Sequence, residues 1–246
     1  MNYPFFSLMI PLFAGYSVYQ ILTQTADFII INKSPGISVH KDQGDEGLTM
    51  LLQRQLELDE IFLIHRLDKV TSGVMVFAKN RETAADLSMQ FQNREVEKFY
   101  LAVSANKPKR KQGLVCGDME KSRRGSWKLL RSKINPAMTQ FVSVAMKPGF
   151  RLFLLKPSTG KTHQIRVALK SEGAPILGDN MYGGEEADRT YLHAYQLAFT
   201  LNEERYIFRA LPTDGVHFDH QFSTLVESSF SQPEMENWPK LPSVKC

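Results

Sequence analysis

The sequence predicts an α+β fold, in which a mainly antiparallel, mixed β-sheet forms the core and helices flank it. The chain has 246 residues, 43% of them hydrophobic, which is enough to bury a substantial core. Several strand-like runs follow one another without a helix between them, and strands that are adjacent in sequence usually pair antiparallel. Helical periodicity is confined to a few short segments.

Nine runs that are rich in β-branched, aromatic and other apolar residues are predicted to be strands. In chain order they are 28–32, 37–40, 61–64, 74–77, 98–104, 140–145, 152–155, 191–201 and 206–211. Four segments are predicted to be helices from the spacing of their apolar residues. They are 48–58, 82–92 with Asn80 as its cap, 162–171 and 218–230.

The distribution of apolar residues along the chain predicts a division into three segments. Residues 1–22 are apolar but have no basic residue before the apolar part, and Pro4 and Pro11 interrupt them. We therefore expect a strand or a packing segment of the core rather than a secretory signal or a membrane span. Residues 23–212 form the main domain. After Pro212 the pattern weakens, and 213–246 are predicted to form a helix and a loose tail.

Several kinds of chemistry are disfavoured. Cys116 and Cys246 are the only cysteines, which excludes a disulfide framework and favours the cytoplasm. None of the six histidines stands in a zinc-protease or zinc-deaminase pattern, so no metal is expected. Residues 158–162 resemble a phosphate-binding loop, but Leu155 stands where that loop requires glycine.

A basic stretch between positions 104 and 133 contains ten basic residues and only two acidic ones, whereas the whole chain carries a net charge of +4. Such a stretch is either a solvated face or a surface that contacts a phosphate backbone. Trp127 within it could stack on a base or anchor the loop. The candidate RNA-binding residues of the stretch are Lys107, Lys109, Arg110, Lys111, Arg123, Arg124 and Lys128.

The most informative segment is 65–73, H-R-L-D-K-V-T-S-G, which lies between two predicted strands. A loop of this kind holds Asp68 on a rigid scaffold, where a carboxylate can act in catalysis. The alternative is that Asp68 only braces its own turn.

This segment closely resembles the active-site motif of the RluA family of RNA pseudouridine synthases, in which the aspartate is the essential residue. Further segments resemble the same family, and they occur in the family's order. They are I-I-N-K-S-P-G-I-S-V-H at 30–40, E-K-F-Y-L-A-V at 97–103, P-S-T-G-K-T-H-Q-I-R-V at 157–167 with P-I-L-G-D at 175–179, and L-H-A at 192–194. Two departures are mild, since Ser34 stands where proline is common and Lys161 replaces the usual arginine.

The resemblance implies the pseudouridine synthase fold and a role for each motif residue. Asp68 is the catalytic carboxylate, Tyr100 lies against the target uracil, and Arg166 pairs with Asp68 and keeps it ionised. Arg66 fills the space that a flipped base leaves. Leu192 and Ile165 are candidates for the wall of the uracil pocket.

Each of these assignments has a structural alternative. Arg66 could form an ordinary ion pair, Tyr100 and Leu192 could be core residues of a strand, and Arg166 could be a surface residue of its helix. His65, His163 and His193 are expected to brace the motif loops through ring hydrogen bonds.

The resemblance therefore implies an isomerase that converts a specific uridine to pseudouridine in a ribosomal or transfer RNA stem-loop, with no cofactor. No obligate protein partner and no membrane association are expected, and the small N-terminal RNA-binding domain that many relatives carry is not expected either. Two other classes of function stay open: an RNA-binding or assembly factor that has lost the chemistry, and an aspartate-dependent hydrolase of RNA or nucleosides.

Overall fold

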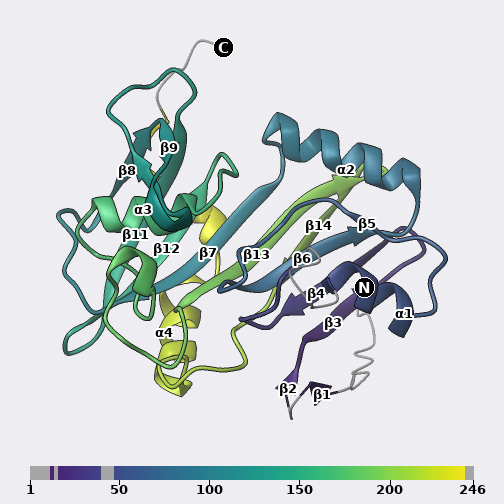
Figure 1. The fold of residues 1–246 in the computed structure, drawn as a ribbon, viewed down its shortest axis with the longest axis horizontal. Coiled ribbons are helices and arrows are strands. Elements are labelled where there is room, and N and C mark those ends of the chain that lie inside the picture. The colour runs from purple at the N-terminus through teal and green to yellow at the C-terminus, as the bar shows by residue number, and fades with distance from the viewer. Residues whose placement is uncertain (1–11, 14–15, 40–46, 242–246) are drawn as a thin grey trace. The chain divides into compact units, whose positions relative to one another are not determined.

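The computed structural model describes residues 12–13, 16–39 and 47–241. The chain forms two compact units, and each is built from two separate stretches of sequence. The first unit comprises Met1–Glu97 and Ala194–Thr213, and the second comprises Lys98–His193 and Asp214–Cys246. Figure 1 shows the helices and strands of both.

The first unit is built on antiparallel strands. Strand β4 (Phe28–Lys33) pairs with β3 (Tyr19–Gln24) on one side and with β6 (Ser72–Ala78) on the other. The short β5 (Phe62–Leu63) also pairs with β6, and β13 (Leu192–Leu201) pairs with β14 (Glu204–Arg209). A two-residue hairpin, β1 (Leu12–Phe13) and β2 (Tyr16–Ser17), precedes them.

Two helices complete the first unit, α1 (Leu48–Gln55) and α2 (Arg81–Asn93). Helix α2 begins where the side chain of Asn80 accepts a hydrogen bond from the N–H of Thr83 at 2.8 Å, which satisfies one of the helix's first free donors. The helix lies along β5 and β6 (Figure 1). In the core, the ring of Phe28 meets the edges of three aromatic rings, those of Phe199, Tyr206 and Phe208.

The second unit is also antiparallel, with strands in the order β7 (Glu97–Ser104), β12 (Phe150–Pro157), β11 (Ala137–Lys147) and β8 (Gln112–Gly117). A hairpin of β9 (Met119–Lys121) and β10 (Trp127–Leu129) follows β8, with the 3-10 turn η1 (Arg123–Gly125) at its tip. Helices α3 (Gln164–Ser171) and α4 (His220–Phe230) and two short 3-10 helices, η2 (Asn180–Tyr182) and η3 (Pro233–Met235), complete it.

The α+β class and the antiparallel pairing are confirmed, as are all four helices and eight of the nine strands to within a few residues at each end. The strand predicted at 37–40 is wrong over residues 37–39, which pair with no strand; the carbonyl of Ser38 instead accepts a hydrogen bond from the N–H of Leu48, at the start of α1, at 3.3 Å. His40 lies outside the described residues. The three-segment division of the chain stays a prediction. None of the helices among the described residues is long and apolar enough to span a membrane.

The segment after α4 was predicted to be loose, but it is packed at least as far as Pro239. The ring of Trp238 contacts that of Phe99 at 5.9 Å between centroids, and its indole N–H donates to the carbonyl of Pro233 at 2.9 Å. The side-chain amide of Gln140 donates to the carbonyl of Pro239. A tryptophan buries enough apolar surface to fix a segment that has no regular secondary structure.

Candidate active site

Asp68 lies in the first unit, in the loop between β5 and β6, and backbone hydrogen bonds fix this loop. The carbonyl of Asp68 accepts a hydrogen bond from the N–H of Thr71 at 2.9 Å. The neighbouring Lys69 carbonyl accepts from the N–H of Gly36 at 2.7 Å, which ties the loop to the turn of the first motif. Leu67 is buried, the Asp68 side chain is half-buried, and Arg66 is exposed. The loop therefore holds a carboxylate and a guanidinium near the surface on a rigid support.

Gly73 joins this loop to the last motif. Its φ is +121°, and a Cβ at this position would lie 2.3 Å from the carbonyl oxygen of Ala194. No side chain fits in such a space, so only glycine allows the two backbones to approach so closely. Three of the segments that were singled out in the sequence, at 30–40, 65–73 and 192–194, thus meet in the first unit through Gly36, Lys69, Gly73 and Ala194.

His65 braces the same loop, as the sequence predicted. Its Nε2 accepts a hydrogen bond from the backbone N–H of Val76 at 3.2 Å, and its ring stacks on that of Phe91 at 4.6 Å. A ring nitrogen that accepts from a backbone N–H must carry no proton, so the bond favours one neutral tautomer.

Arg166 lies on α3 in the second unit, and it is only 4% exposed. Its Nε and Nη2 donate to the two carboxylate oxygens of Asp179, at 2.7 and 2.8 Å. The alternative that Arg166 is a surface residue is therefore wrong. Asp179 is the last residue of the P-I-L-G-D segment, and nothing in the sequence predicted it as the partner of Arg166. The pairing of Arg166 with Asp68 stays a prediction.

Tyr182 is a second residue of this site that no sequence motif predicted. It is 2% exposed, and the guanidinium of Arg166 lies 4.9 Å from the centre of its ring. Its hydroxyl is 2.8 Å from Nδ1 of His163 and accepts a hydrogen bond from the backbone N–H of Trp127 at 2.9 Å. Through this backbone N–H, Tyr182 links the hairpin β9–β10 to the segment that carries Arg166.

The loop that carries Asp179 and Tyr182 is closely packed against its surroundings. Gly178 has a φ of +76°, and a Cβ there would lie 1.8 Å from the carbonyl oxygen of Arg189. A Cβ on Gly184 would lie equally close to the carbonyl oxygen of Ile176. Glycine at both positions allows the loop to fold against its neighbours, which fixes Asp179 against Arg166.

Three other candidate residues lie on regular elements of the second unit. Tyr100 is half-buried in β7 and is paired with Leu155 of β12. Leu192, at the start of β13, and Ile165, on α3, are 3% and 7% exposed. Their roles at the uracil stay predictions. His193 is fully buried, with its ring 6.4 Å from that of Phe218.

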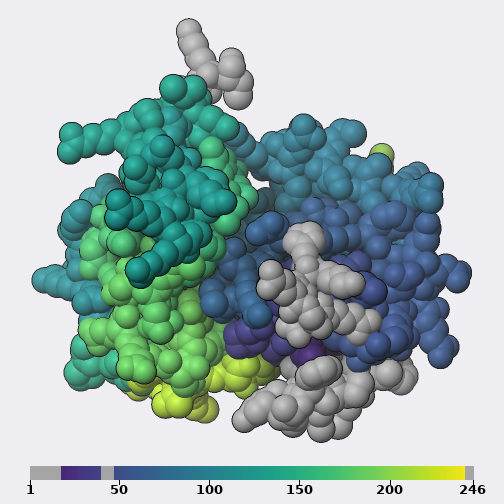
Figure 2. Space-filling view, in the orientation of Figure 1, coloured from purple at the N-terminus to yellow at the C-terminus, as the bar shows by residue number. Residues whose placement is uncertain are grey.

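The basic stretch separates into residues that are held by the fold and residues that face solvent. Arg110 donates from Nε and Nη2 to Glu172, and this bonding raises the pKa of the guanidinium above its usual value. Lys109 donates to the carbonyl of Ser171 at 2.8 Å, and Lys128 pairs with Glu120 at 2.9 Å on the hairpin. The remaining candidates are exposed and have no ion-pair partner among the described residues: Lys107, Lys111, Arg123 and Arg124. In Figure 2 the stretch appears in teal at the surface of the face that is drawn.

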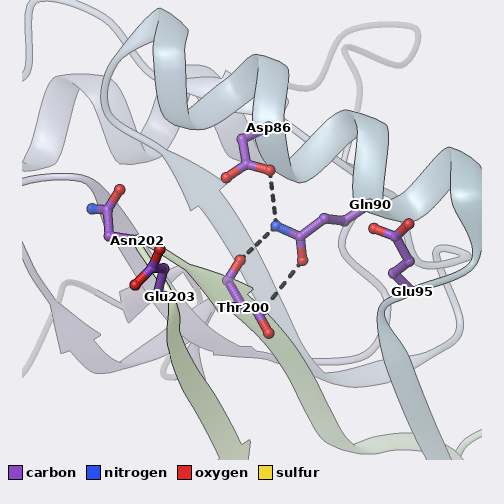
Figure 3. A pocket seen from close by; sticks show the side chains of 6 residues that line it. All are labelled: Asp86, Gln90, Glu95, Thr200, Asn202 and Glu203. Carbon is purple, nitrogen blue, oxygen red and sulfur yellow. Dashed lines mark hydrogen bonds between the residues drawn. The ribbon is translucent and has the colours of Figure 1, made fainter.

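A shallow pocket in the first unit lies between α2 and the turn after β13 (Figure 3). The side-chain amide of Gln90 bridges Asp86, at 3.0 Å, and both backbone groups of Thr200. Glu95, Asn202 and Glu203 complete the lining. Because three of these side chains are carboxylates, the pocket repels phosphate and is not suited to bind RNA.

Comparison with known proteins identifies the family. Residues 27–171 match the family model described as RNA pseudouridylate synthase. A protein of Haemophilus influenzae that is described as an uncharacterized RNA pseudouridine synthase is 55% identical over 198 residues, which cover 80% of this chain and 88% of that protein. The ribosomal large subunit pseudouridine synthase C of Vibrio vulnificus is 30% identical, over 73% of this chain and 61% of that protein.

A solved structure, human RNA Pseudouridylate Synthase Domain Containing 4, superposes with a TM-score of 0.68 at 28% identity, over 82% of this chain and 92% of that one. Human RNA Pseudouridylate Synthase Domain Containing 1 shares the fold, with a TM-score of 0.71 at 23% identity, over 94% of this chain and all of that one. The motifs, the fold and these matches agree. The chain belongs to the RNA pseudouridylate synthase family, as a member of its RluA type, the isomerases that convert uridine to pseudouridine in RNA.

Proposed function

We propose that this chain isomerises one specific uridine in a structured RNA, with Asp68 as the catalytic carboxylate. One observation carries the proposal: the closely spaced backbones of the three motif segments hold the loop of Asp68 in place and leave its side chain only half-buried. The close packing of Gly73 on Ala194 keeps the backbone beside Asp68 in place, as a catalytic carboxylate requires.

The reaction breaks the bond between nitrogen 1 of uracil and the ribose, turns the base, and joins carbon 5 to the same ribose carbon. The hydrogen on carbon 5 leaves to solvent and nitrogen 1 takes up a proton, so the mass of the RNA does not change. A stacked uridine must first leave the helix, at a cost of a few kcal/mol. The exposed guanidinium of Arg66 is suited to stack in the vacated space, because it is planar and weakly hydrated.

Tyr100 and Arg166 complete the proposed chemistry. The ring of Tyr100 offers a face for the turned base, and its hydroxyl can help to move the proton at carbon 5. Arg166 is the proposed cation beside Asp68, which must be ionised to act as a nucleophile or base. The bidentate bond of Arg166 to Asp179 supports this role, since it fixes the orientation of the guanidinium.

The proposed substrate is a stem-loop of ribosomal RNA, with transfer RNA as the second candidate. Two kinds of relative favour ribosomal RNA, since they are named ribosomal large subunit pseudouridine synthases C and D. The proposed location is the cytoplasm, where such RNA is found and where the two cysteines would stay reduced.

Tritium release tests this function. RNA labelled at carbon 5 of uridine, prepared from cells that lack the gene, is incubated with the protein, and both released tritium and free uracil are measured. We expect tritium release from ribosomal RNA with no free uracil and no strand cleavage. Free uracil or cleaved RNA would instead indicate a hydrolase, and binding of RNA without any tritium release would indicate a binding or assembly factor.

The tip of the hairpin β9–β10 is predicted to contact the phosphate backbone. Changing both Arg123 and Arg124 to glutamine should weaken RNA binding and lower the magnitude of the slope of log K against log salt by about 1.4 to 1.8, since each lost phosphate contact contributes about 0.7 to 0.9. Binding measured at several salt concentrations checks this.

The matched control is the double change of Arg81 and Arg94, two exposed arginines of the first unit, to glutamine. It removes the same charge but should leave the slope close to that of the wild type. An unchanged slope for the Arg123 and Arg124 variant would contradict a role for the hairpin in RNA binding.

A further inference from the structure

The turn between β10 and β11, residues 131–135, exposes an isoleucine at its tip. All five residues of this turn are exposed. Ile134 is 90% exposed, the highest value for a large hydrophobic side chain among the residues that the structure describes. A single exposed apolar residue is common, so the exposure alone carries no function. What distinguishes Ile134 is how firmly its turn is held and which charges flank it.

Hydrogen bonds to Asp118 fix the turn. Its carboxylate accepts hydrogen bonds from two consecutive backbone N–H groups, those of Ile134 at 3.0 Å and Asn135 at 2.8 Å. Its own backbone N–H donates to the carbonyl of Ser132 at 2.8 Å, and its carbonyl accepts from the N–H of Leu130 at 2.8 Å. Both ends of the turn are therefore fixed to one residue. The Ser132 hydroxyl and then these backbone donors keep the pKa of the Asp118 carboxyl below its usual value.

Gly117 allows this close contact. A Cβ at this position would lie 2.3 Å from the carbonyl oxygen of Leu130, so a larger residue would force β8 and the start of the turn apart. The turn is thus held by hydrogen bonds and by close backbone packing, although all its side chains face solvent.

Lys161 also fixes the turn, through a hydrogen bond to its last residue. Its ammonium group donates to the carbonyl of Asn135. Its backbone N–H donates to the side chain of Gln164, at 3.0 Å, and Gln164 in turn donates to the carbonyl of Met138, at 3.0 Å. Lys161 and Gln164 belong to the T-G-K-T-H-Q-I-R segment that carries Arg166. The turn of Ile134 is therefore anchored to the segment that positions a proposed catalytic residue. This also gives a role to Lys161, which stands where the family usually has arginine.

The charges beside Ile134 match a nucleic acid. Arg131 and Lys133 are exposed, and neither has an ion-pair partner among the described residues. Unpaired cations on both sides of an apolar tip suit a strand whose phosphates lie outside and whose bases can be unstacked. Apolar side chains held in this manner are used to pack against or between bases.

We propose that Ile134 is an RNA-binding residue, the tip of a fixed turn that packs against an unpaired base while Arg131 and Lys133 contact the phosphates beside it. The proposal rests on the proposed action on RNA. Through Ile134 the protein would distinguish an unpaired base from a paired one. The arginines at the tip of the hairpin contact only phosphates and cannot make this distinction.

Two RNA probes and three variants test the proposal. The probes are a fluorescent stem-loop RNA with an unpaired uridine loop and a blunt RNA duplex of similar length, and binding is measured at several salt concentrations.

Ile134→Ala should weaken stem-loop binding by about fivefold to tenfold, the effect of removing a few apolar carbons from a contact. It should leave the salt slope and duplex binding unchanged. Ile134→Leu should keep wild-type affinity, and Lys133→Gln should lower the salt slope by about one.

Val216→Ala is the matched control, since Val216 is a second exposed apolar residue, 72% exposed, in the same unit. It should not change the binding of either probe. The proposal is overturned if Ile134→Ala binds the stem-loop as the wild type does, or if it weakens duplex and stem-loop binding equally. The tritium-release assay on the wild type tests the proposed isomerase activity separately. That activity can be present even if Ile134 does not contact RNA. If the wild type bound neither probe and released no tritium, both proposals would fall together.

Discussion

Replacing Asp68 by asparagine is expected to abolish tritium release from labelled RNA, with a loss of roughly a thousandfold or more. An amide has the size of the carboxylate but can neither attack the ribose or the base nor take up a proton at neutral pH. The hydrogen bonds that are described for the loop use the backbone of Asp68, Lys69 and Gly36, so the substitution leaves them in place. RNA binding should therefore stay close to that of the wild type.

Asp59→Asn is the control for this change, since Asp59 is an exposed aspartate on the same unit, just before β5. It should keep full tritium release. If the Asp68 variant kept more than about a tenth of wild-type activity, Asp68 would not be the catalytic carboxylate, and another residue would have to supply it.

Replacing Asp179 by alanine is expected to lower the free energy of unfolding of the second unit by about 3 to 5 kcal/mol, because it removes one partner of a buried ion pair. Arg166 and Asp179 are 4% and 2% exposed, and the loss would leave the guanidinium without its bidentate acceptor in a site closed to water. Both tryptophans of the chain, Trp127 and Trp238, lie in this unit, so their fluorescence during urea unfolding reports on it.

Glu120→Ala provides the comparison, because Glu120 lies in the same unit and its ion pair with Lys128 is exposed to solvent. This variant should unfold at the wild-type urea concentration. Replacing Asp179 with leucine and Arg166 with methionine together should cost less than Asp179→Ala alone, since the guanidinium is then removed together with its bidentate acceptor. Equal midpoints for Asp179→Ala and Glu120→Ala would show that the buried pair contributes little.

Much of the fold could be predicted because local rules decide it. The run 28–32 is buried on both faces, the cap of α2 is Asn80, and the glycine after Pro148 turns the chain between β11 and β12. Residues 37–40 were predicted to resume extended structure after a turn at Ser34, Pro35 and Gly36, but 37–39 do not form a strand. Tertiary contacts decided otherwise, since the turn at Gly36 bonds to Lys69 and not to a neighbouring strand.

The candidate site was predictable only in part. The motif letters picked out Asp68 and Arg166 and implied that the two pair, but they did not predict the buried pair of Arg166 with Asp179. That depends on how the loop 175–184 folds back, which Gly178 and Gly184 allow and which no sequence period reveals. Tyr182 lacked any signal of its own, because a tyrosine in a loop is read as surface or core until its neighbours are known.

Because each unit is built from two separate stretches of the sequence, the first unit cannot finish folding early in synthesis. The first unit begins at the amino terminus but needs β13 and β14, which end at Arg209, and the side chain of Asn32 bonds to the carbonyl of Leu211, 179 residues away. Because the chain is made from its amino terminus, β6 must wait for its neighbour β13 while residues 98–191, the first stretch of the second unit, are made. A nascent chain of this length presents an unpaired edge, which is a risk of aggregation. A fragment that ends at Glu97 is therefore not expected to fold by itself. Chaperones that cover exposed strand edges are expected to bind the nascent chain mainly between the synthesis of β6 and that of β13.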